Sequence, residues 1–486
     1  MFKNKIDRAI KKYINLPAPI KASFWFTITS ILQKGISFIT VPIFTRLLTA
    51  NQFGLFNVYK SWLSIITIFA TLSLHAGVFN NGMTKFEEDR DEFTSSMQGL
   101  SSTITVALFV VYLISRNFWN NIFGLPTFLI TILFAEILFS EALKLWSAKK
   151  RYAYKYKNLV IVTISISLLN PIIGVIAVML SENKGISRIV SFAFVQISIS
   201  LIIYIFNFYK GKKFFIKKYW KFALAFNIPL IPHYLSGTVL SQADRIMINN
   251  FIGSDKAGIY SVAYSGSMVI NIIQNSINKS FIPWTYKRLK NEEYNKLAEV
   301  SNYILVLVGV LVVLLVLLAP EVINILAPEE YYEGIWVVPP VAASVFFIFL
   351  YVLFANVEFY FEENKFIMFA SVTAALLNFG LNYYLIPIFG YLVAGYTTLF
   401  SYVIYSFAHF LFMKKITIKY LNGERIYDYK FIFLISISII IISLFSLLLY
   451  KNFVIRILII LILLSIIFVK RKSLLNKLNL IITKEE

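Results

Sequence analysis

The sequence contains no cysteine, and its 486 residues include only three histidines, His75, His233 and His409. The lack of thiols excludes disulfides, cysteine-ligated zinc and cysteine-ligated iron–sulfur clusters. The histidines are far apart in the sequence, so a histidine metal site is not expected. No Gly-x-x-x-x-Gly-Lys-Ser/Thr phosphate loop is present, which argues against ATP hydrolysis by that route. We therefore predict no metal and no cofactor.

Charged residues are also scarce. Only 15% of the residues are charged, whereas 58% are hydrophobic and 17% aromatic, and the mean hydropathy is +0.72. A soluble domain carries about 25% charged residues, so lipid must cover much of this protein, and an ordinary soluble enzyme is excluded. The net charge of +21 does not indicate a nucleic-acid partner, because the basic residues lie between hydrophobic runs, as loop charges do in membrane proteins.

Long hydrophobic runs are abundant. A membrane-spanning helix needs about 20 mainly apolar residues, and fourteen segments of the sequence meet this requirement. No connection between them is long enough to form a soluble domain. We predict an all-α, polytopic membrane fold with spans near residues 22–44, 54–76, 97–115, 122–143, 158–180, 187–209, 222–248, 257–282, 301–319, 335–357, 366–386, 391–412, 431–450 and 453–469.

The distribution of basic residues predicts the orientation. Of the 46 Lys and Arg residues, 35 fall in alternate connections, and such residues are enriched on the cytoplasmic side of a membrane. We therefore predict a multi-pass protein of the cytoplasmic membrane with both termini in the cytoplasm. The first residues are compatible with either an amphipathic interfacial helix or a flexible basic tail. The predicted cytoplasmic segments are 1–21, 83–96, 144–157, 210–221, 283–300, 358–365, 413–430 and 470–486.

The two halves of the chain share landmarks at a nearly constant spacing. The segment LTANQFGLF around Gly54 matches IGSDKAGIY around Gly258, and these glycines are 204 residues apart. Gly185 and Gly390, before the sixth and twelfth spans, are 205 residues apart. Two landmarks at one period indicate a duplication of six spans. Because six is even, the copies should run parallel about an axis along the membrane normal.

This duplication predicts the domain organisation. A cytoplasmic segment precedes the first six-helix bundle, a basic linker leads to the second bundle, and two extra spans follow a cytoplasmic loop. The predicted boundaries, in that order and ending with the cytoplasmic tail, are 1–21, 22–209, 210–221, 222–412, 413–430, 431–469 and 470–486.

Polar residues inside the spans concentrate on the first, second, seventh and eighth. Such residues are costly at membrane depth unless they face protein or water, so these spans predict a water-filled cavity between the halves. Its cationic residues would be Lys34, Lys60, Arg245 and Lys279. A cationic cavity favours an anionic substrate such as a phosphate or diphosphate. Further polar or ion-coupling candidates are His75, His233, Asp244, Asn271, Asn275 and Glu136.

These residues also have structural interpretations. Polar faces often only hold membrane helices together, and Arg245 lies toward a helix end, where a long side chain reaches the interface. Asp244 could simply neutralise Arg245 or a neighbouring helix end, and Glu136 and Glu141 could be ion-coupling carboxylates or simply partners of Lys144. Lys34 is the hardest to explain in this way, because it lies near the middle of its span.

Several short motifs resemble those of a known family. These are the two repeated segments around Gly54 and Gly258, ADRIMI at 243–248, and IPIFG at 386–390. Together they resemble the polysaccharide biosynthesis (Wzx-type) flippases of the MATE-like MOP superfamily, over residues 20–470. The resemblance implies two six-helix bundles around a central cavity that opens alternately to each side. Two extra C-terminal helices occur in some relatives, including the lipid II flippase.

The resemblance also implies a function. The substrate would be an undecaprenyl-diphosphate-linked oligosaccharide, a repeat unit of O-antigen, capsule or another surface polysaccharide. Its partners would be the phospholipid bilayer and other surface-polysaccharide assembly proteins. The cationic cavity residues of relatives correspond in kind, but not by a strict motif, to those proposed here. The alternatives are a MATE-type multidrug or cation antiporter and an integral-membrane glycan polymerase or acyltransferase. An exporter of cations would need an acidic cavity, and polymerases usually have a large outer loop.

Overall fold

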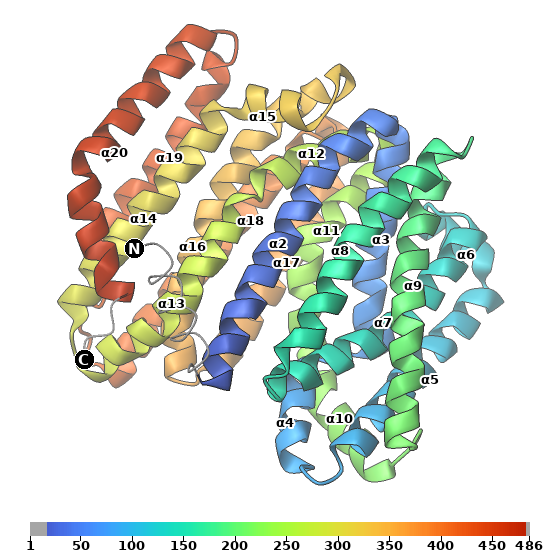
Figure 1. Ribbon diagram of the computed structural model, residues 1–486. Helices are drawn as coiled ribbons and strands as arrows, with labels where there is room; N and C mark the ends of the chain where they lie inside the picture. Colours follow the sequence, from blue (N-terminus) through green and yellow to red (C-terminus); the bar gives the residue numbers. More distant parts are fainter. Residues whose placement is uncertain (1–16, 483–486) are drawn as a thin grey trace, which may run out of the picture. The chain divides into compact units, whose positions relative to one another are not determined.

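The computed structural model describes residues 17–482, excluding the side chains of 364, 365, 467 and 470–482. Most of the segment for which an amphipathic interfacial helix was considered, residues 1–16, lies outside the described residues. The described part consists of helices and connections without a β-strand, as Figure 1 shows. This confirms the predicted all-α fold. Within the chain, two compact units form: unit 1 comprises the described residues up to Leu48 and residues 59–235, and unit 2 comprises residues 49–58 and those from 236 onward.

The helices follow the predicted spans closely. In unit 1 and its junctions they are α2 (Ala18–Leu47), α3 (Ala50–Thr71), α4 (Gly77–Lys85), α5 (Arg90–Ile114), α6 (Arg116–Phe123), α7 (Thr127–Tyr152), α8 (Tyr156–Met179), α9 (Lys184–Gly211), α10 (Lys217–Asn227) and η1 (Ile228–Leu230). Next come α11 (Ile231–Phe251), α12 (Ser254–Ser267), α13 (Ile270–Lys290), α14 (Tyr294–Leu317), α15 (Ala319–Leu326), η2 (Glu329–Trp336), α16 (Val338–Tyr360), α17 (Asn364–Phe389), α18 (Val393–Tyr420), α19 (Tyr429–Leu449) and α20 (Phe453–Ile482).

Fewer helices than the fourteen predicted spans are clearly long and apolar enough to cross a membrane. Ten of the described helical segments are long and apolar enough to cross a membrane, and the bent pair α6–α7 raises the number to eleven. All fourteen predicted spans fall on helices, but the count of fourteen is not confirmed. The predicted span 257–282 is broken between α12 and α13, and 391–412 lies in α18, which carries a buried polar face. In 453–469, the apolar helix is short within the described residues.

Unit 1 has an aromatic core near the start of α5. Phe79 and Met83 of α4, Phe93 of α5 and Tyr219 of α10 are all buried there. The rings of Phe93 and Tyr219 meet edge to face, with centroids 5.4 Å apart. Such packing fixes α10 against α4 and α5, because aromatic pairs favour this geometry.

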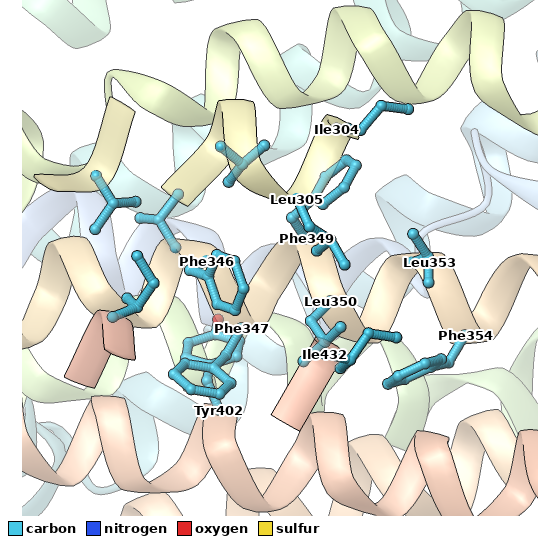
Figure 2. Close-up of a cluster of buried hydrophobic side chains, with 14 of the residues drawn as sticks. Ile304, Leu305, Phe346, Phe347, Phe349, Leu350, Leu353, Phe354, Tyr402 and Ile432 are labelled. Atoms are coloured by element: carbon cyan, nitrogen blue, oxygen red, sulfur yellow. The ribbon is translucent and has the colours of Figure 1, made fainter. Parts of the chain in front are cut away.

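Unit 2 is built around α16. Figure 2 shows Phe346, Phe347 and Leu350 of this helix packed among side chains of α14, α18 and α19, among them Ile304 and Ile432. A helix that is apolar on all sides must be buried or face lipid, and α16 is the most completely buried span of the described part. Since lipid is as apolar as these side chains, close packing rather than removal from water stabilises this core.

The two glycines of the repeated motif meet within unit 2. Gly54 and Gly258 lie in the first two turns of α3 and α12, whose first residues, Ala50 and Ser254, are also 204 residues apart. A Cβ atom on Gly54 would lie 1.7 Å from the carbonyl oxygen of Ser254, and one on Gly258 would lie 2.2 Å from that of Ala50. Each glycine therefore relieves steric crowding for the other.

The second pair of landmark glycines does not occupy equivalent places. Gly390 ends α17 with a positive φ of 79°, a conformation that favours glycine, whereas Gly185 is the second residue of α9. Their similar spacing in the sequence therefore reflects no common backbone role. The duplication and the predicted domain boundaries stay predictions.

Candidate functional site

A buried carboxylate lies at the centre of a polar cluster in unit 2. Asp244 of α11 is fully buried and accepts three side-chain hydrogen bonds. The Tyr260 hydroxyl of α12 donates to Oδ2 at 2.6 Å, and the Thr398 hydroxyl of α18 donates to the same atom at 3.0 Å. Nδ2 of Asn382 in α17 donates to Oδ1 at 2.6 Å. One carboxylate thus ties four helices together.

A second layer of polar groups surrounds Asn382. Its Oδ1 accepts a hydrogen bond from the Thr397 hydroxyl, and its Nδ2 also donates to Oδ1 of Asn378, 3.3 Å away. Asn378 is fully buried, and its own Nδ2 has no hydrogen-bond partner within the described residues. The cluster gathers one carboxylate and several neutral oxygen atoms, which is the donor chemistry that a proton or a small hard cation requires.

Arg245, the next residue of α11, does not neutralise Asp244 by direct contact. Its guanidinium donates to the carbonyl of Ser241 at 2.5 Å and lies 4.2 Å from the ring centre of Tyr264. No ion pair within 4 Å joins it to Asp244 among the described residues. Asp244 and Arg245 are therefore neighbours in charge without forming a direct ion pair. Arg245, predicted to line a cavity, is itself only 6% exposed within unit 2.

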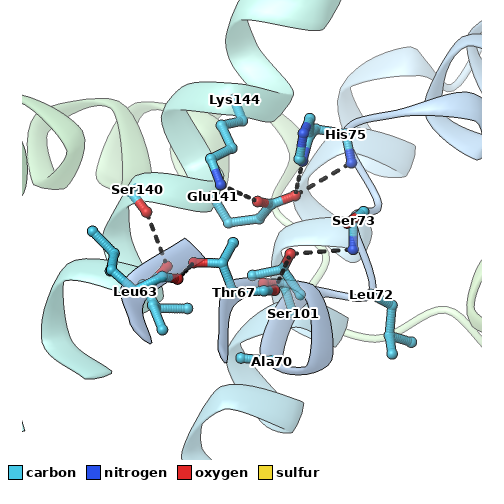
Figure 3. A network of polar contacts seen from close by, with 12 residues as sticks. Leu63, Thr67, Ala70, Leu72, Ser73, His75, Ser101, Ser140, Glu141 and Lys144 are labelled. Carbon is cyan, nitrogen blue, oxygen red and sulfur yellow. Dashed lines mark hydrogen bonds and ion pairs between the residues drawn. The ribbon is translucent and has the colours of Figure 1, made fainter. Parts of the chain in front are cut away.

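Unit 1 contains a different buried carboxylate, beside the turn where α3 ends within the predicted span 54–76. Figure 3 shows Glu141 of α7 directed at the turn after α3. Its Oε1 accepts hydrogen bonds from the backbone N–H of His75 at 3.2 Å and from Nδ1 of the same residue at 2.9 Å. Nζ of Lys144 lies 3.6 Å from Oε2. Both partners of this buried carboxylate carry or can carry positive charge.

The turn itself is strained. Leu72 and Ser73 have positive φ angles of 49° and 50°, which cost about 1–3 kcal/mol each for residues with a side chain. Asn227 donates from Nδ2 to the Leu72 carbonyl at 2.7 Å, and the Thr71 hydroxyl accepts from the Ser73 N–H at 3.2 Å. Together with the bond from the His75 N–H to Glu141, these bonds provide hydrogen-bond partners for backbone groups that have none within the helix at the end of α3.

Glu136, one turn before Glu141, has another partner. It is 2% exposed, and its Oε2 accepts a hydrogen bond of 2.8 Å from the Tyr59 hydroxyl of α3. The predicted pairing with Lys144 is not its closest contact, because that lysine lies against Glu141 instead. Each unit therefore buries a carboxylate against a tyrosine hydroxyl, Glu136 with Tyr59 in unit 1 and Asp244 with Tyr260 in unit 2.

The remaining candidates lie on α2, α3, α11 and α13. Lys34 of α2 and Lys60 of α3 are exposed in unit 1, and Lys279 of α13 is exposed in unit 2. Asn271 and Asn275 of α13 follow the break after α12. The Asn271 amide donates to the Met268 sulfur and the Asn275 amide to the Asn271 carbonyl. His233 is half-buried, with its ring 6.1 Å from that of Tyr234.

Three buried polar arrangements were missed in the sequence. Asn378 and Asn382 are spaced i, i+4 in α17, a signal that could have placed them on one face. The other two give little sequence signal, because each joins distant residues. His409 of α18 and Glu358 of α16 are both fully buried, with 2.7 Å between Nδ1 and Oε1. Arg456 of α20 makes two bonds, of 2.7 and 2.8 Å, to Glu321 of α15.

The Arg456–Glu321 pair fixes the last helices in unit 2. Hydrogen bonds from Arg456 stabilise the charged form of Glu321, so the pKa of this carboxyl group is below its usual value. Arg456 also donates to the Leu317 carbonyl at 2.7 Å, and the Tyr450 hydroxyl donates to the Val316 carbonyl at 3.0 Å. These contacts join α19 and α20 to the end of α14.

No cluster of three or more His, Asp or Glu side chains suited to a metal ion occurs among the described residues.

Comparison with known proteins identifies the family. The sequence model described as "Polysaccharide biosynthesis protein" matches residues 20–288. The chain belongs to the polysaccharide biosynthesis protein family. This agrees with the resemblance carried by the sequence motifs.

Two sequence relatives agree with this membership. A protein of the Lsg locus of Haemophilus influenzae is 19% identical over 377 residues, covering 74% of this chain and 88% of that protein. The capsular polysaccharide biosynthesis protein CapF of Staphylococcus aureus is 23% identical over 338 residues, covering 65% and 79%.

Two solved structures show the fold. The lipid II flippase MurJ, in an inward closed conformation, has a TM-score of 0.68 at 17% identity, covering 92% of this chain and 99% of that chain. An inward-facing MATE multidrug resistance transporter of the MOP superfamily has a TM-score of 0.58 at 11% identity, covering 79% and 94%. The chain is therefore a multi-pass membrane protein with the MurJ and MATE fold.

Proposed function

We propose that this protein is a flippase that moves an undecaprenyl-diphosphate-linked oligosaccharide across the bacterial cytoplasmic membrane by alternating access. The observation that carries this proposal is the likeness to the fold of a lipid II flippase over 92% of the chain, together with membership of the polysaccharide biosynthesis family. The name of the CapF relative supports a surface-polysaccharide repeat unit as the glycan. Both termini would lie in the cytoplasm.

The cationic residues support an anionic substrate. Lys34 lies in an apolar helix, is exposed, and has no partner within the described residues. A lysine facing lipid at mid-membrane would cost about 2.5–3.5 kcal/mol, so its ammonium group is expected to face water. There it would attract the diphosphate of the substrate while the lipid tail stays in the bilayer. Lys60, also exposed in unit 1, would add to this attraction, and Lys279 and Arg245 would supply positive charge in unit 2.

Asp244 would couple transport to an ion. Its hydrogen-bond partners are all neutral, so binding of a proton or a small cation would compensate a buried negative charge. Because these partners come from α12, α17 and α18, ion binding would bias how the four helices pack. An ion can drive a conformational change only through such a difference between states. Transport that depends on sodium at constant pH would identify the cation, and dependence on a pH gradient alone would identify the proton.

Deletion of the gene tests the proposal. Lipid-linked glycan should accumulate in the inner leaflet, and the intact gene should restore its appearance on the outer leaflet. In proteoliposomes, the purified protein should expose a lipid-linked oligosaccharide to a glycosidase added outside. Normal glycan export combined with increased sensitivity to cationic drugs would contradict the proposal and favour the MATE-type antiporter. Glycan that reaches the outer leaflet but is not polymerised or acylated would favour a membrane enzyme.

A further inference from the structure

Helix α10 in unit 1 has two different faces. Tyr219, Ala223 and Asn227, spaced four residues apart, are buried and form one face. Tyr219 donates its hydroxyl to Asp89 at 3.1 Å, and Asn227 donates to Leu72. The buried face therefore anchors the helix to α3 and to the start of α5. The opposite face carries Lys217, Trp220, Lys221 and Leu224.

That opposite face forms a groove of about 610 Å³. Phe215, Trp220, Leu224 and Ile228 contribute apolar walls, and two lysines, Lys217 and Lys221, lie at its N-terminal end. Contacts of Trp220 fix the position of the aromatic side chains that line the groove. The indole N–H of Trp220 donates to the Ser96 carbonyl at 3.0 Å, and its ring meets that of Phe215 edge to face, with 4.7 Å between centroids.

The two groove lysines are exposed and make no hydrogen bond, ion pair or ring contact within the described residues. The neighbouring Lys218, in contrast, lies over the ring of Phe86 at 5.0 Å. Asp89 accepts from Tyr219, Glu92 also acts on Tyr219 electrostatically, and Asp91 pairs with Lys149. None of these carboxylates forms an ion pair with Lys217 or Lys221 in the described part of the chain, so the groove presents two ammonium groups without an ion-pair partner.

The backbone adds to this positive charge. The N-terminal end of a helix carries the positive pole of its dipole, and acidic residues are usually found there. The first turn of α10 contains no acidic residue, its N-cap Ile216 provides no side-chain cap, and Lys217 and Lys218 open the helix. Lysines at this pole are unfavourable unless an anion lies near them. The dipole and the unpaired lysines thus point independently to the same kind of ligand.

We propose that this groove binds an anionic phospholipid of the bilayer, with its phosphate on Lys217 and Lys221 and an acyl chain along Leu224 and Ile228. Along α10, Lys217 and Lys221 precede Leu224 and Ile228, as the headgroup of a phospholipid precedes its chain. Trp220, next to Lys221 in the sequence, adds an amphipathic ring of the kind favoured at the membrane interface. The basic segments 83–96, 144–157 and 210–221 meet at this end of unit 1, through bonds such as that of the Ile216 N–H to Ser96.

The test uses the full-length protein in detergent, titrated with phosphatidylglycerol or phosphatidylcholine of the same chain length and followed by native mass spectrometry. The Lys217→Gln/Lys221→Gln variant should bind phosphatidylglycerol about 30-fold more weakly, since each lysine near an anionic lipid contributes appreciably to its attraction. Lys210→Gln/Lys213→Gln is the matched control, because it removes the same charge from exposed positions of the same linker outside the groove. It should change the affinity less than threefold.

Further arms distinguish the ligand. Ala225→Trp keeps every lysine but fills the groove, so it should also displace phosphatidylglycerol, while inorganic diphosphate should not compete at millimolar concentration. Equal losses in both lysine variants, equal binding of phosphatidylcholine, or wild-type affinity in Ala225→Trp would overturn the proposal. Full competition by inorganic diphosphate would show a simple anion site instead. Competition by undecaprenyl diphosphate at tenfold lower concentration than phosphatidylglycerol would assign the groove to the transported lipid and overturn it as well.

Discussion

Units 1 and 2 each bury a carboxylate with no direct route to water, but they compensate its charge differently. Glu141 of unit 1 is bound by His75 and Lys144, and it closes a strained turn between α3 and α4. Asp244 of unit 2 is bound only by hydroxyl and amide groups of three other helices. A carboxylate whose charge is compensated by cationic side chains attracts a further cation only weakly. The difference teaches that two equally buried carboxylates can differ in how their charge is compensated, and it is the reason why the coupling role is proposed for Asp244 and not for Glu141.

Replacing Asp244 is the most severe test of this contrast. We expect Asp244→Asn to lower transport per molecule about 100-fold, which corresponds to about 3 kcal/mol, the value of one hydrogen bond to a buried charge. Flipped glycan should be measured in proteoliposomes and normalised to protein content. Glu136→Gln, at the carboxylate bound to Tyr59 in unit 1, is the matched control. If both variants lose transport equally, the two units share the coupling role and the comparison fails.

The meeting of α3 and α12 tests the packing on which unit 2 depends. Gly54→Ala should destabilise the protein by about 1–3 kcal/mol, because its Cβ would overlap the Ser254 carbonyl and the backbones would have to separate. Gly380→Ala provides the control, since nothing lies within 4 Å of its Cβ position. Thermal unfolding in detergent measures both. A loss no larger than in the control would mean that this close approach is absent in the membrane.

Replacing Glu141 should affect stability and not transport. Glu141→Gln removes the charged acceptor of His75 and the ion pair with Lys144, which should cost about 2 kcal/mol. Transport per folded molecule should remain within twofold of wild type. The midpoint of thermal unfolding and the normalised flipping rate separate the two effects. A variant with normal stability and impaired transport would give Glu141 the functional role assigned to Asp244.

Lys34 provides a third case, a charge that is neither buried nor paired. We expect Lys34→Gln to lower transport per molecule about tenfold, equivalent to 1.4 kcal/mol, and Lys34→Arg to retain more activity because the charge remains. The measurement is flipped glycan normalised to membrane protein level. Lower abundance of Lys34→Gln with normal specific activity would instead indicate a role in helix packing.

The smallest effect on transport is expected from single cysteines introduced to determine which side of the membrane a loop faces. The absence of native cysteine allows single cysteines to be introduced without background. A membrane-impermeant thiol reagent should label Glu329→Cys in unit 2 from outside intact cells, and Lys213→Cys in unit 1 only after the cells are opened. Transport should be unchanged in both. The opposite labelling pattern would reverse the predicted orientation and place the lipid groove of α10 in the outer leaflet.

The sequence by itself was sufficient for the fold class and the positions of the helices. Apolar runs of spanning length have few alternatives to helix in lipid, because a helix satisfies its own backbone hydrogen bonds. The repeated motif also located Gly54 and Gly258 near the starts of two helices. It could not determine that the backbones of the two helices meet there. A glycine in the sequence indicates that a side chain is not needed or not tolerated, but it does not identify the neighbouring segment.

The tertiary structure alone decided which polar residues act together. The partners of Asp244 include Asn382 and Thr398, 138 and 154 residues away, and Glu321 finds Arg456 across 135 residues. Along a membrane helix, the sequence gives the face on which a polar residue lies but not whether lipid, water or another helix covers that face. That choice is made by helix packing, and it determines whether a charge is neutralised, as in Glu141, or remains available to a ligand, as proposed for Asp244.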